Sequence, residues 1–234
     1  MSLTCESSRW WSQVGGESGM ALLDQHVGPD ADWARAVATG EADWQRASRL
    51  TGILTGPTYR MLEIGCGAGR MTCVLAPKYS EVTALDVSES YLESARRNCP
   101  HSNVSFRPIQ SDDLSAADGR EYDVAFSYEV FHYLAPRLLQ KYFVEVHRLL
   151  RAGGQFVFEI NTAPVGWRTR LSLAVRRVLH CCGVETWRGW PTSPHFIRKD
   201  YSPQTVTAML EQAGFRVDKV TQPGRRETWF VASK

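Results

Sequence analysis

Residues 61–70 read MLEIGCGAGR, and Gly65, Gly67 and Gly69 stand at alternate positions directly after a short apolar run. Glycine this dense is costly for an ordered chain, because glycine loses the most backbone freedom on folding. A strand that runs into such glycines and then into a helix is typical of a nucleotide-binding turn. There the bare backbone lets a ligand approach, and the helix N-terminus offers free N–H groups. The stretch therefore predicts a strand–loop–helix unit that binds a nucleotide.

Outward from this stretch, short apolar segments alternate with segments rich in helix-forming residues. We expect strands at 59–65, 81–88, 103–111, 122–129 and 153–161, and helices at 68–79, 88–98 and 130–152, the last interrupted near Pro136. A helix at 202–214 then precedes two closing strands, 215–222 and 227–234. Such alternation predicts a mostly parallel sheet covered by helices on both faces, with its ligand at the carboxyl ends of the strands.

Two segments fall outside this alternation. Residues 1–56 read as an N-terminal helical cap, and its stretch 31–54 is rich in helix formers with an expected break near Gly40. Residues 57–234 form the main domain. Within it, residues 163–200 are too long for a simple connection, and a long insertion is usually functional.

The composition is that of an ordinary globular protein. The 234 residues are 43% hydrophobic and 22% charged, and the net charge of +2 gives no global argument for nucleic acid or membrane as partner. The six cysteines form no C-x-x-C pair and no Cys/His cluster with zinc-like spacing. We expect reduced thiols, no signal peptide and no membrane span, and hence a cytoplasmic protein.

Two acidic residues narrow the choice of nucleotide. Asp86 ends the strand after the glycine loop, where a carboxylate can accept hydrogen bonds from both hydroxyls of a ribose. A dinucleotide site favours G-x-G-x-x-G, whereas this loop reads G-x-G-x-G and is followed by Arg70. Glu63, two residues before the first glycine, is awkward for a diphosphate but suits a ligand with an ammonium group. The pattern argues against a nicotinamide-dependent oxidoreductase.

As a set, five stretches resemble the successive motifs of the class I S-adenosylmethionine-dependent methyltransferases. They are LEIGCGAGRMT (62–72), VTALDVSESYLESARRN (82–98), FSYEVFHYL (126–134), LLRAGGQFVFEIN (149–161) and YSPQTVTAMLEQAGFRVDKV (201–220). The resemblance covers roughly residues 57–162 and 200–234. It implies an α/β fold with a Rossmann-like, doubly wound, mostly parallel seven-stranded sheet whose last strand is antiparallel and inserted beside its neighbour. N-terminal helices and a helical lid insertion at 163–200 would complete it.

The resemblance also implies a cofactor, S-adenosylmethionine, with S-adenosylhomocysteine as the product. Gly65, Cys66 and Gly67 would line the methionine and ribose of the donor. Glu63 would orient the methionine amine, directly or through water, and Asp86 would hold the ribose hydroxyls.

The adenine would be held by the next two loops. Val87 would lie against the ring, and in the loop IQSDDL either Asp112 or Asp113 would take the exocyclic amine while Leu114 covers the ring.

The methionine end of the donor would lie beside the fourth strand. Ser127 and Tyr128 end that strand and would line this part of the site. Many relatives also place an arginine of an N-terminal helix on the donor carboxylate, and Arg46 and Arg49 are both candidates here.

Methyl transfer needs the acceptor in line with the methyl group and water excluded, and it needs a general base only when the acceptor carries a proton at its working pH. His132, just after the fourth strand, and His195, in the insertion, are the candidate catalytic bases, each weighed against a purely structural role. Glu129 could instead meet a cationic acceptor. No metal is expected.

The insertion carries a basic amphipathic helix. Trp167, Leu171, Ala174, Val175 and Val178 share one face at helical spacing, and arginines lie mostly elsewhere. The favoured hypothesis is a lid helix whose apolar face packs on the domain. A pocket for an anionic or aromatic small molecule comes second, and a membrane-surface helix third.

The sequence therefore predicts a methyltransferase that acts on an oxygen or nitrogen of a small-molecule acceptor. The alternatives are an enzyme for a lipid-soluble or membrane-bound acceptor and a non-catalytic S-adenosylmethionine-binding protein. Nucleic acid is disfavoured as substrate, because the fourth strand lacks the Asn/Asp-Pro-Pro-aromatic motif and Lys and Arg only balance Asp and Glu. The acceptor and the oligomeric state are not encoded in any motif that we find.

Overall fold

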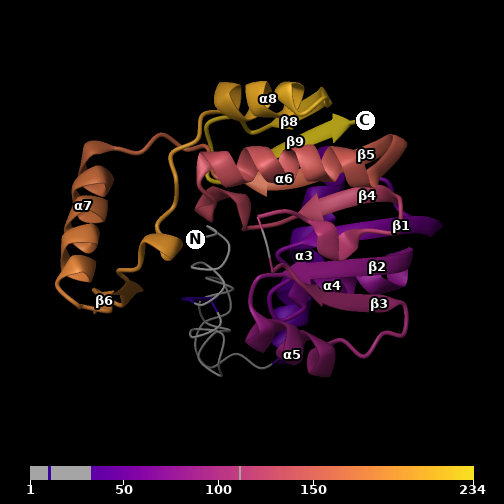
Figure 1. Ribbon diagram of the computed structural model, residues 1–234, viewed down its shortest axis with the longest axis horizontal. Helices are drawn as coiled ribbons and strands as arrows, with labels where there is room; N and C mark the ends of the chain where they lie inside the picture. Colours follow the sequence, from indigo (N-terminus) through magenta and orange to yellow (C-terminus); the bar gives the residue numbers. More distant parts are fainter. Residues whose placement is uncertain (1–9, 12–32, 111) are drawn as a thin grey trace.

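The computed structural model describes residues 10–11, 33–110 and 112–234 (Figure 1). Its sheet contains seven strands in the order β3-β2-β1-β4-β5-β9-β8. Their bounds are β1 Gly56–Ile64, β2 Tyr79–Asp86, β3 Val104–Pro108, β4 Tyr122–Ser127, β5 Leu150–Ile160, β8 Arg216–Thr221 and β9 Thr228–Ser233. Strands β1 to β5 are parallel, and β9 lies antiparallel between β5 and β8. The predicted sheet, with its last strand antiparallel and inserted, is confirmed.

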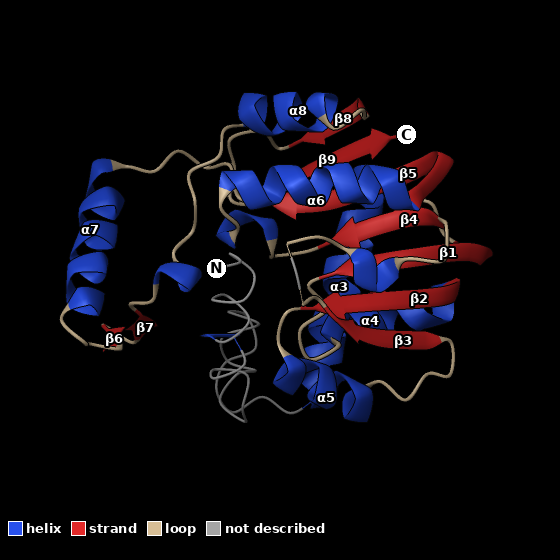
Figure 2. Ribbon diagram, viewed as in Figure 1, coloured by secondary structure: helices blue, strands red, loops and turns tan. Residues whose placement is uncertain are grey.

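Helices cover both faces of this sheet (Figure 2). The helices that do so are α3 Trp33–Thr51, α4 Arg70–Leu75, α5 Glu89–Asn98, α6 Pro136–Leu149 and α8 Pro203–Gln212, whereas α7 Trp167–Cys181 lies in the insertion. Because side chains alternate along a strand, neighbouring residues of β1 enter different cores. Met61 packs with residues of α3, α4 and α5, whereas Leu62 packs with residues of α6 and α8. The α6 side is rich in phenylalanines that pack edge-to-face or tilted against one another, among them Phe131, Phe156 and Phe158.

Local signals account for the helix starts, and one boundary is corrected: α6 spans Pro136–Leu149, so the helix expected at 130–152 is shorter at both ends and residues 150–152 belong to β5. Pro136 is the first residue of α6, where its missing N–H has no partner to lose. The Ser202 hydroxyl accepts a hydrogen bond from the backbone N–H of Thr205 at the start of α8. Ser88 caps α5 in the same way, because its hydroxyl accepts a hydrogen bond from the backbone N–H of Tyr91. This bond holds the turn between β2 and α5.

Helix α3 corrects one expectation, because it runs unbroken through Gly40. A Cβ at this position would lie 3.2 Å from the carbonyl oxygen of Arg70 and 3.3 Å from Cγ2 of Val74. Gly40 is therefore a point where α3 and α4 approach closely, not a helix break. The other N-terminal helices that we predicted lie outside the described residues.

The insertion corrects a second expectation. Helix α7 stands away from the sheet (Figure 1), and a two-stranded hairpin, β6 Thr186–Trp187 and β7 Trp190–Pro191, follows it. No residue of α7 is buried, so its apolar face does not pack on the domain as the favoured hypothesis required. The part of the insertion that does pack on the domain is the short helical turn η5, Pro194–Phe196, with buried Phe196. Within the part of the chain that the structure describes, no helix has the length and apolar character to cross a membrane.

Candidate cofactor site

The glycine loop follows β1 and enters α4 at Gly69. Gly65 and Gly69 both have positive φ, 79° and 91°. A Cβ on Gly65 would lie 2.2 Å from Cγ2 of Val130, and one on Gly69 would lie 3.2 Å from Cα of Ala95. Both the backbone angle and the close neighbours require glycine at these two positions. The loop therefore forms one side of a cavity whose wall is bare backbone.

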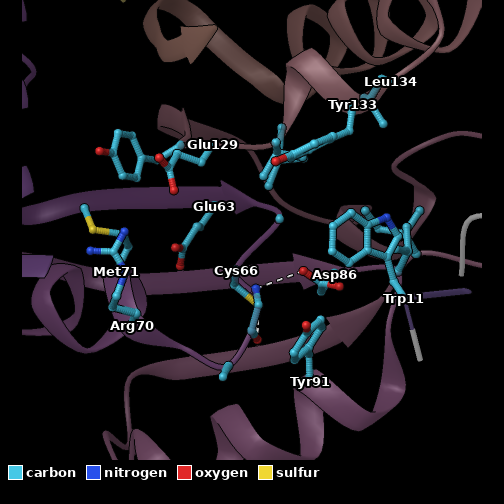
Figure 3. A pocket seen from close by; sticks show the side chains of 18 of the residues that line it. Trp11, Glu63, Cys66, Arg70, Met71, Asp86, Tyr91, Glu129, Tyr133 and Leu134 are labelled. Carbon is cyan, nitrogen blue, oxygen red and sulfur yellow. Dashed lines mark hydrogen bonds between the residues drawn. The ribbon is translucent and has the colours of Figure 1, made fainter. Parts of the chain in front are cut away.

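Asp86 closes the loop from the neighbouring strand. Its Oδ2 accepts the backbone N–H of Gly67 at 2.9 Å, and its Oδ1 accepts that of Ser88 at 2.9 Å. Figure 3 shows this contact between the loop and Asp86 on the cavity wall. Burial raises the pKa of Asp86 above its usual value, and the hydrogen bonds from the backbone oppose that rise. Since each carboxylate oxygen has two lone pairs, both can still accept a hydrogen bond from a ligand hydroxyl.

Glu63 lies on the same cavity wall and is buried. Its Oε2 accepts a 2.7 Å hydrogen bond from the Thr72 hydroxyl on α4. Burial raises the pKa of Glu63 to about 7, and the hydrogen bond from Thr72 opposes that rise. The carboxyl group therefore sits near the midpoint of its titration at neutral pH, where a cationic ligand group would favour the ionised form.

An ion-pair network joins α3 to the loop. The buried carboxylate of Asp43 accepts from Arg70 Nη1 at 2.7 Å and from Arg46 Nη2 at 2.9 Å. Arg46 also donates to Glu227 at 2.8 Å and to the Tyr128 hydroxyl at 3.3 Å. Arg70 lines the cavity, whereas the two predicted carboxylate ligands, Arg46 and Arg49, are not among the described lining residues. The sequence did offer a signal for Arg70 as a cavity residue, because it directly follows the glycine loop.

The rest of the wall is largely aromatic and apolar. Tyr128, Glu129 and Val130 come directly after β4, and Val87 follows Asp86. Other described lining residues share an aromatic or aliphatic side chain: Trp11, Tyr91, Ile109, Tyr133, Leu134, Leu138 and Tyr142. Trp11 and Tyr133 pack together with ring centroids 5.7 Å apart, and Phe196 of the insertion packs on both, 6.0 and 5.5 Å away. The insertion thus supports the cavity wall through Phe196, and the sequence reasoning had not singled out these aromatic residues as part of the site.

Four of the predicted contact residues are not among the described residues that line the cavity. Leu114 is fully buried in the core, and Asp113 accepts hydrogen bonds from the backbone and hydroxyl of Ser115. Asp112 lies 3.6 Å from Lys141 Nζ, and the Ser127 hydroxyl donates to the carbonyl oxygen of Ile64. Their predicted contacts with the donor stay predictions. Ile109 supplies the apolar surface at this end of the cavity instead.

The two candidate bases also lie outside the described cavity lining. His132 is buried, and burial lowers its pKa to about 3. Its Nδ1 lies 3.8 Å from Oε2 of Glu159, and burial raises the pKa of that carboxyl. His195 stacks on Trp10 with ring centroids 6.3 Å apart. Glu129 does line the cavity, with a left-handed φ of 58° and its N–H donated to Glu159. The predicted catalytic role of His132 and His195 gains no support from their positions.

A family model for the methyltransferase domain matches residues 61–154. The chain is 29% identical over 168 residues to an uncharacterized methyltransferase of Synechocystis, covering 72% of each chain. It is 27% identical over 212 residues to a ubiquinone biosynthesis O-methyltransferase of Ruegeria, covering 89% of this chain and 78% of that protein. Among solved structures, the complex of DhpI with SAM and HEP has the same fold, with a TM-score of 0.62 at 18% identity over the full length of both chains.

The strand order, the glycine loop closed by Asp86, and these relatives agree with one another. The chain belongs to the class I S-adenosylmethionine-dependent methyltransferases.

Proposed function

We propose that this methyltransferase transfers the methyl group to an oxygen or nitrogen of a small-molecule acceptor, with oxygen favoured. The observation that carries the proposal is the aromatic wall formed by Trp11 and Tyr133, which offers flat apolar surface to a planar organic molecule. A curated relative that covers most of the chain is named an O-methyltransferase, which supports oxygen. The free thiols of the five described cysteines fit our expectation of a cytoplasmic enzyme.

The cavity residues suit the parts of S-adenosylmethionine in turn. Asp86 would accept hydrogen bonds from the two ribose hydroxyls, and the bare backbone at Gly65 and Gly67 leaves room for the ribose and methionine. Glu63 would pair with the methionine amine. Arg70 is a candidate partner for the donor carboxylate, because its guanidinium lines the cavity on the same side as Tyr128, 5.6 Å from the ring centroid.

The bound donor supplies an electrophilic methyl group on a positively charged sulfur. The residues of this chain then have three tasks: to hold the acceptor in line, to exclude water and to accept a proton where the acceptor is a hydroxyl. Tyr133 and Trp11 would perform the first two. The transfer would join the acceptor oxygen to the methyl carbon and leave the electron pair of the former carbon–sulfur bond on sulfur. The hydroxyl proton then passes to a carboxylate, for which Glu129 is the lining candidate.

A labelled-methyl experiment tests this proposal. The enzyme, S-adenosylmethionine labelled on its methyl group, and a cell extract should place the label in small organic molecules that are separable from protein and nucleic acid. Tyr133→Leu should reduce this transfer while leaving the affinity for S-adenosylhomocysteine within about threefold, because the ring contributes to the acceptor side. Label confined to macromolecules would contradict the proposed acceptor class.

The pKa of Glu63 predicts how donor binding depends on pH. Below about pH 6, the affinity for S-adenosylhomocysteine should fall about tenfold per pH unit, because protonation of Glu63 then competes with binding of the ligand amine. At alkaline pH it should fall again as the ligand amine loses its own proton. Calorimetric titration across this pH range measures the affinity on both sides of its maximum, which we call the acid limb and the basic limb.

Glu63→Gln serves as the control, since the amide has no proton to lose in this range. It should remove the acid limb and keep the basic one. An acid limb of unchanged slope in this variant would show that another group titrates.

A further inference from the structure

Helix α7 carries an apolar stripe that faces solvent. Trp167, Leu171, Ala174 and Val178 follow one another at spacings of four, three and four residues, which places them on one helix face. The exposed fractions are 70% for Trp167, 59% for Leu171 and 63% for Val178. A folded protein in water normally turns such a stripe inward, because its burial is favourable. We call these four residues the α7 stripe.

The opposite side of α7 is what holds the helix in place. Leu173, Arg176 and Leu179 are half-buried there. Arg176 donates a hydrogen bond to the carbonyl oxygen of Pro191 in β7, which ties the helix to the hairpin. The outward direction of the stripe is therefore a consequence of contacts on the inner face.

Positive charge flanks the stripe on both sides. At helical spacing, Arg168 lies to one side, and Arg170 and Arg177 lie to the other. The Arg168 guanidinium lies 5.3 Å from the ring centroid of Trp167. Arg170 lies 3.5 Å from Asp200, with both side chains more than half exposed. The insertion, residues 163–200, contains seven lysines and arginines and two acidic residues, Glu185 and Asp200.

The hairpin after α7 continues this surface. It lies at the C-terminal end of the helix (Figure 1) and carries Trp187 and Trp190, the latter 44% exposed. Arg188, between the two tryptophans, lies 4.8 Å from the ring centroid of Trp187. Exposed tryptophan beside arginine is typical of surfaces at the boundary between water and lipid headgroups, where the ring is partly buried and the cation stays at the phosphate.

From these contacts we infer that the α7 stripe, its flanking arginines and the hairpin are a docking surface for an anionic membrane. A second copy of the chain fits the stripe less well, because two such faces would bring arginines against arginines. An anionic lipid surface supplies both partners at once, acyl chains for the stripe and phosphates for the arginines. This inference does not rest on the acceptor class proposed above.

Vesicle flotation of the full chain tests the inference. The protein should float with vesicles of phosphatidylcholine and phosphatidylglycerol, and only weakly with phosphatidylcholine alone. Replacing the stripe by Trp167→Gln, Leu171→Gln and Val178→Gln together should weaken binding to the anionic vesicles at least about tenfold. Replacing Arg168 and Arg177 by Gln should weaken it about thirtyfold at low salt, since each basic residue near an anionic surface contributes about a factor of five.

Val144→Gln is the matched control, because Val144 is also an exposed apolar residue, 48% exposed, on α6 away from the insertion. It should float like the unmodified protein. All variants should keep their affinity for S-adenosylhomocysteine, which shows that they are folded.

Three outcomes would overturn the inference. The first is no flotation of the unmodified protein with anionic vesicles. The second is equal flotation of the stripe variant and the Val144 variant. The third is a concentration-dependent dimer in sedimentation that the stripe variant lacks, together with no vesicle binding, since the stripe would then be a contact between copies.

Discussion

Asp86→Asn should weaken binding of S-adenosylhomocysteine by about 100-fold, equivalent to about 2.7 kcal/mol. The carboxylate accepts backbone N–H groups on both oxygens, from Gly67 and from Ser88. In whichever way the amide of asparagine is turned, its NH₂ group faces one of these N–H donors, and the same NH₂ cannot accept from a ribose hydroxyl. The variant therefore loses a charge-assisted hydrogen bond to the ligand and loosens the loop. Isothermal titration calorimetry measures the change.

Asp118→Asn gives the control for this experiment. Asp118 is exposed and pairs with Arg148 at 2.7 Å, outside the described cavity lining. This variant should bind the product with unchanged affinity and should unfold within about 0.5 kcal/mol of the unmodified protein. Equal affinity of the Asp86 variant and the unmodified protein would mean that the ribose does not contact this carboxylate.

Much of the site could be predicted because its signals are local. The glycines of 65–69 and the acid at 86 each end a strand, and in a parallel sheet the carboxyl ends of neighbouring strands meet at one edge. Ser202 and Pro136 mark helix starts by the same local rules. The end of the helix expected at 130–152 was wrong, because β5 already begins at Leu150.

The errors occur where a contact joins distant parts of the chain. Gly40 looked like a helix break, but the reason for a glycine there lies in α4, thirty residues away, where an added Cβ would lie only 3.2 Å from the carbonyl oxygen of Arg70 and 3.3 Å from Val74. The periodicity of α7 identified an apolar face, yet periodicity alone does not say which way that face turns. Its direction is set by contacts on the other face, such as the bond from Arg176 to Pro191.

The acid–base properties of His132 and Glu63 also depend on contacts that the local sequence does not specify. His132 follows the fourth strand, as a catalytic base should, but the chain buries it next to Glu159 and lowers its pKa to about 3. Glu63, by contrast, acquires a pKa of about 7 because the folded chain buries it, although the hydrogen bond from Thr72 acts in the opposite direction. Sequence position gave the right strand end for both residues, and burial, which is a property of the whole fold, decided what each can do.

Gly65→Ala should destabilise the protein by about 3 kcal/mol and abolish measurable donor binding. The added Cβ would lie 2.2 Å from Cγ2 and 2.9 Å from Cγ1 of Val130, at a φ of 79° that costs an alanine about 1 kcal/mol on its own. Since Val130 also lines the cavity, the shift that relieves this clash changes the donor site. Urea unfolding measures the loss of stability, and calorimetry measures the loss of binding.

Gly119→Ala separates the two causes, because Gly119 has a φ of 87° and no atom within 4 Å of an added Cβ. It should cost only about 1 kcal/mol, the part that comes from the backbone angle, and leave donor binding unchanged. The double variant Gly65→Ala with Val130→Ala removes both Cγ atoms and leaves the nearest contact, to the Val130 Cβ, at 3.0 Å. It should therefore bind the donor again, at reduced affinity. If Gly65→Ala alone were no more destabilising than Gly119→Ala, the close approach of the loop to Val130 would be wrong, and with it the reason why this loop must be glycine.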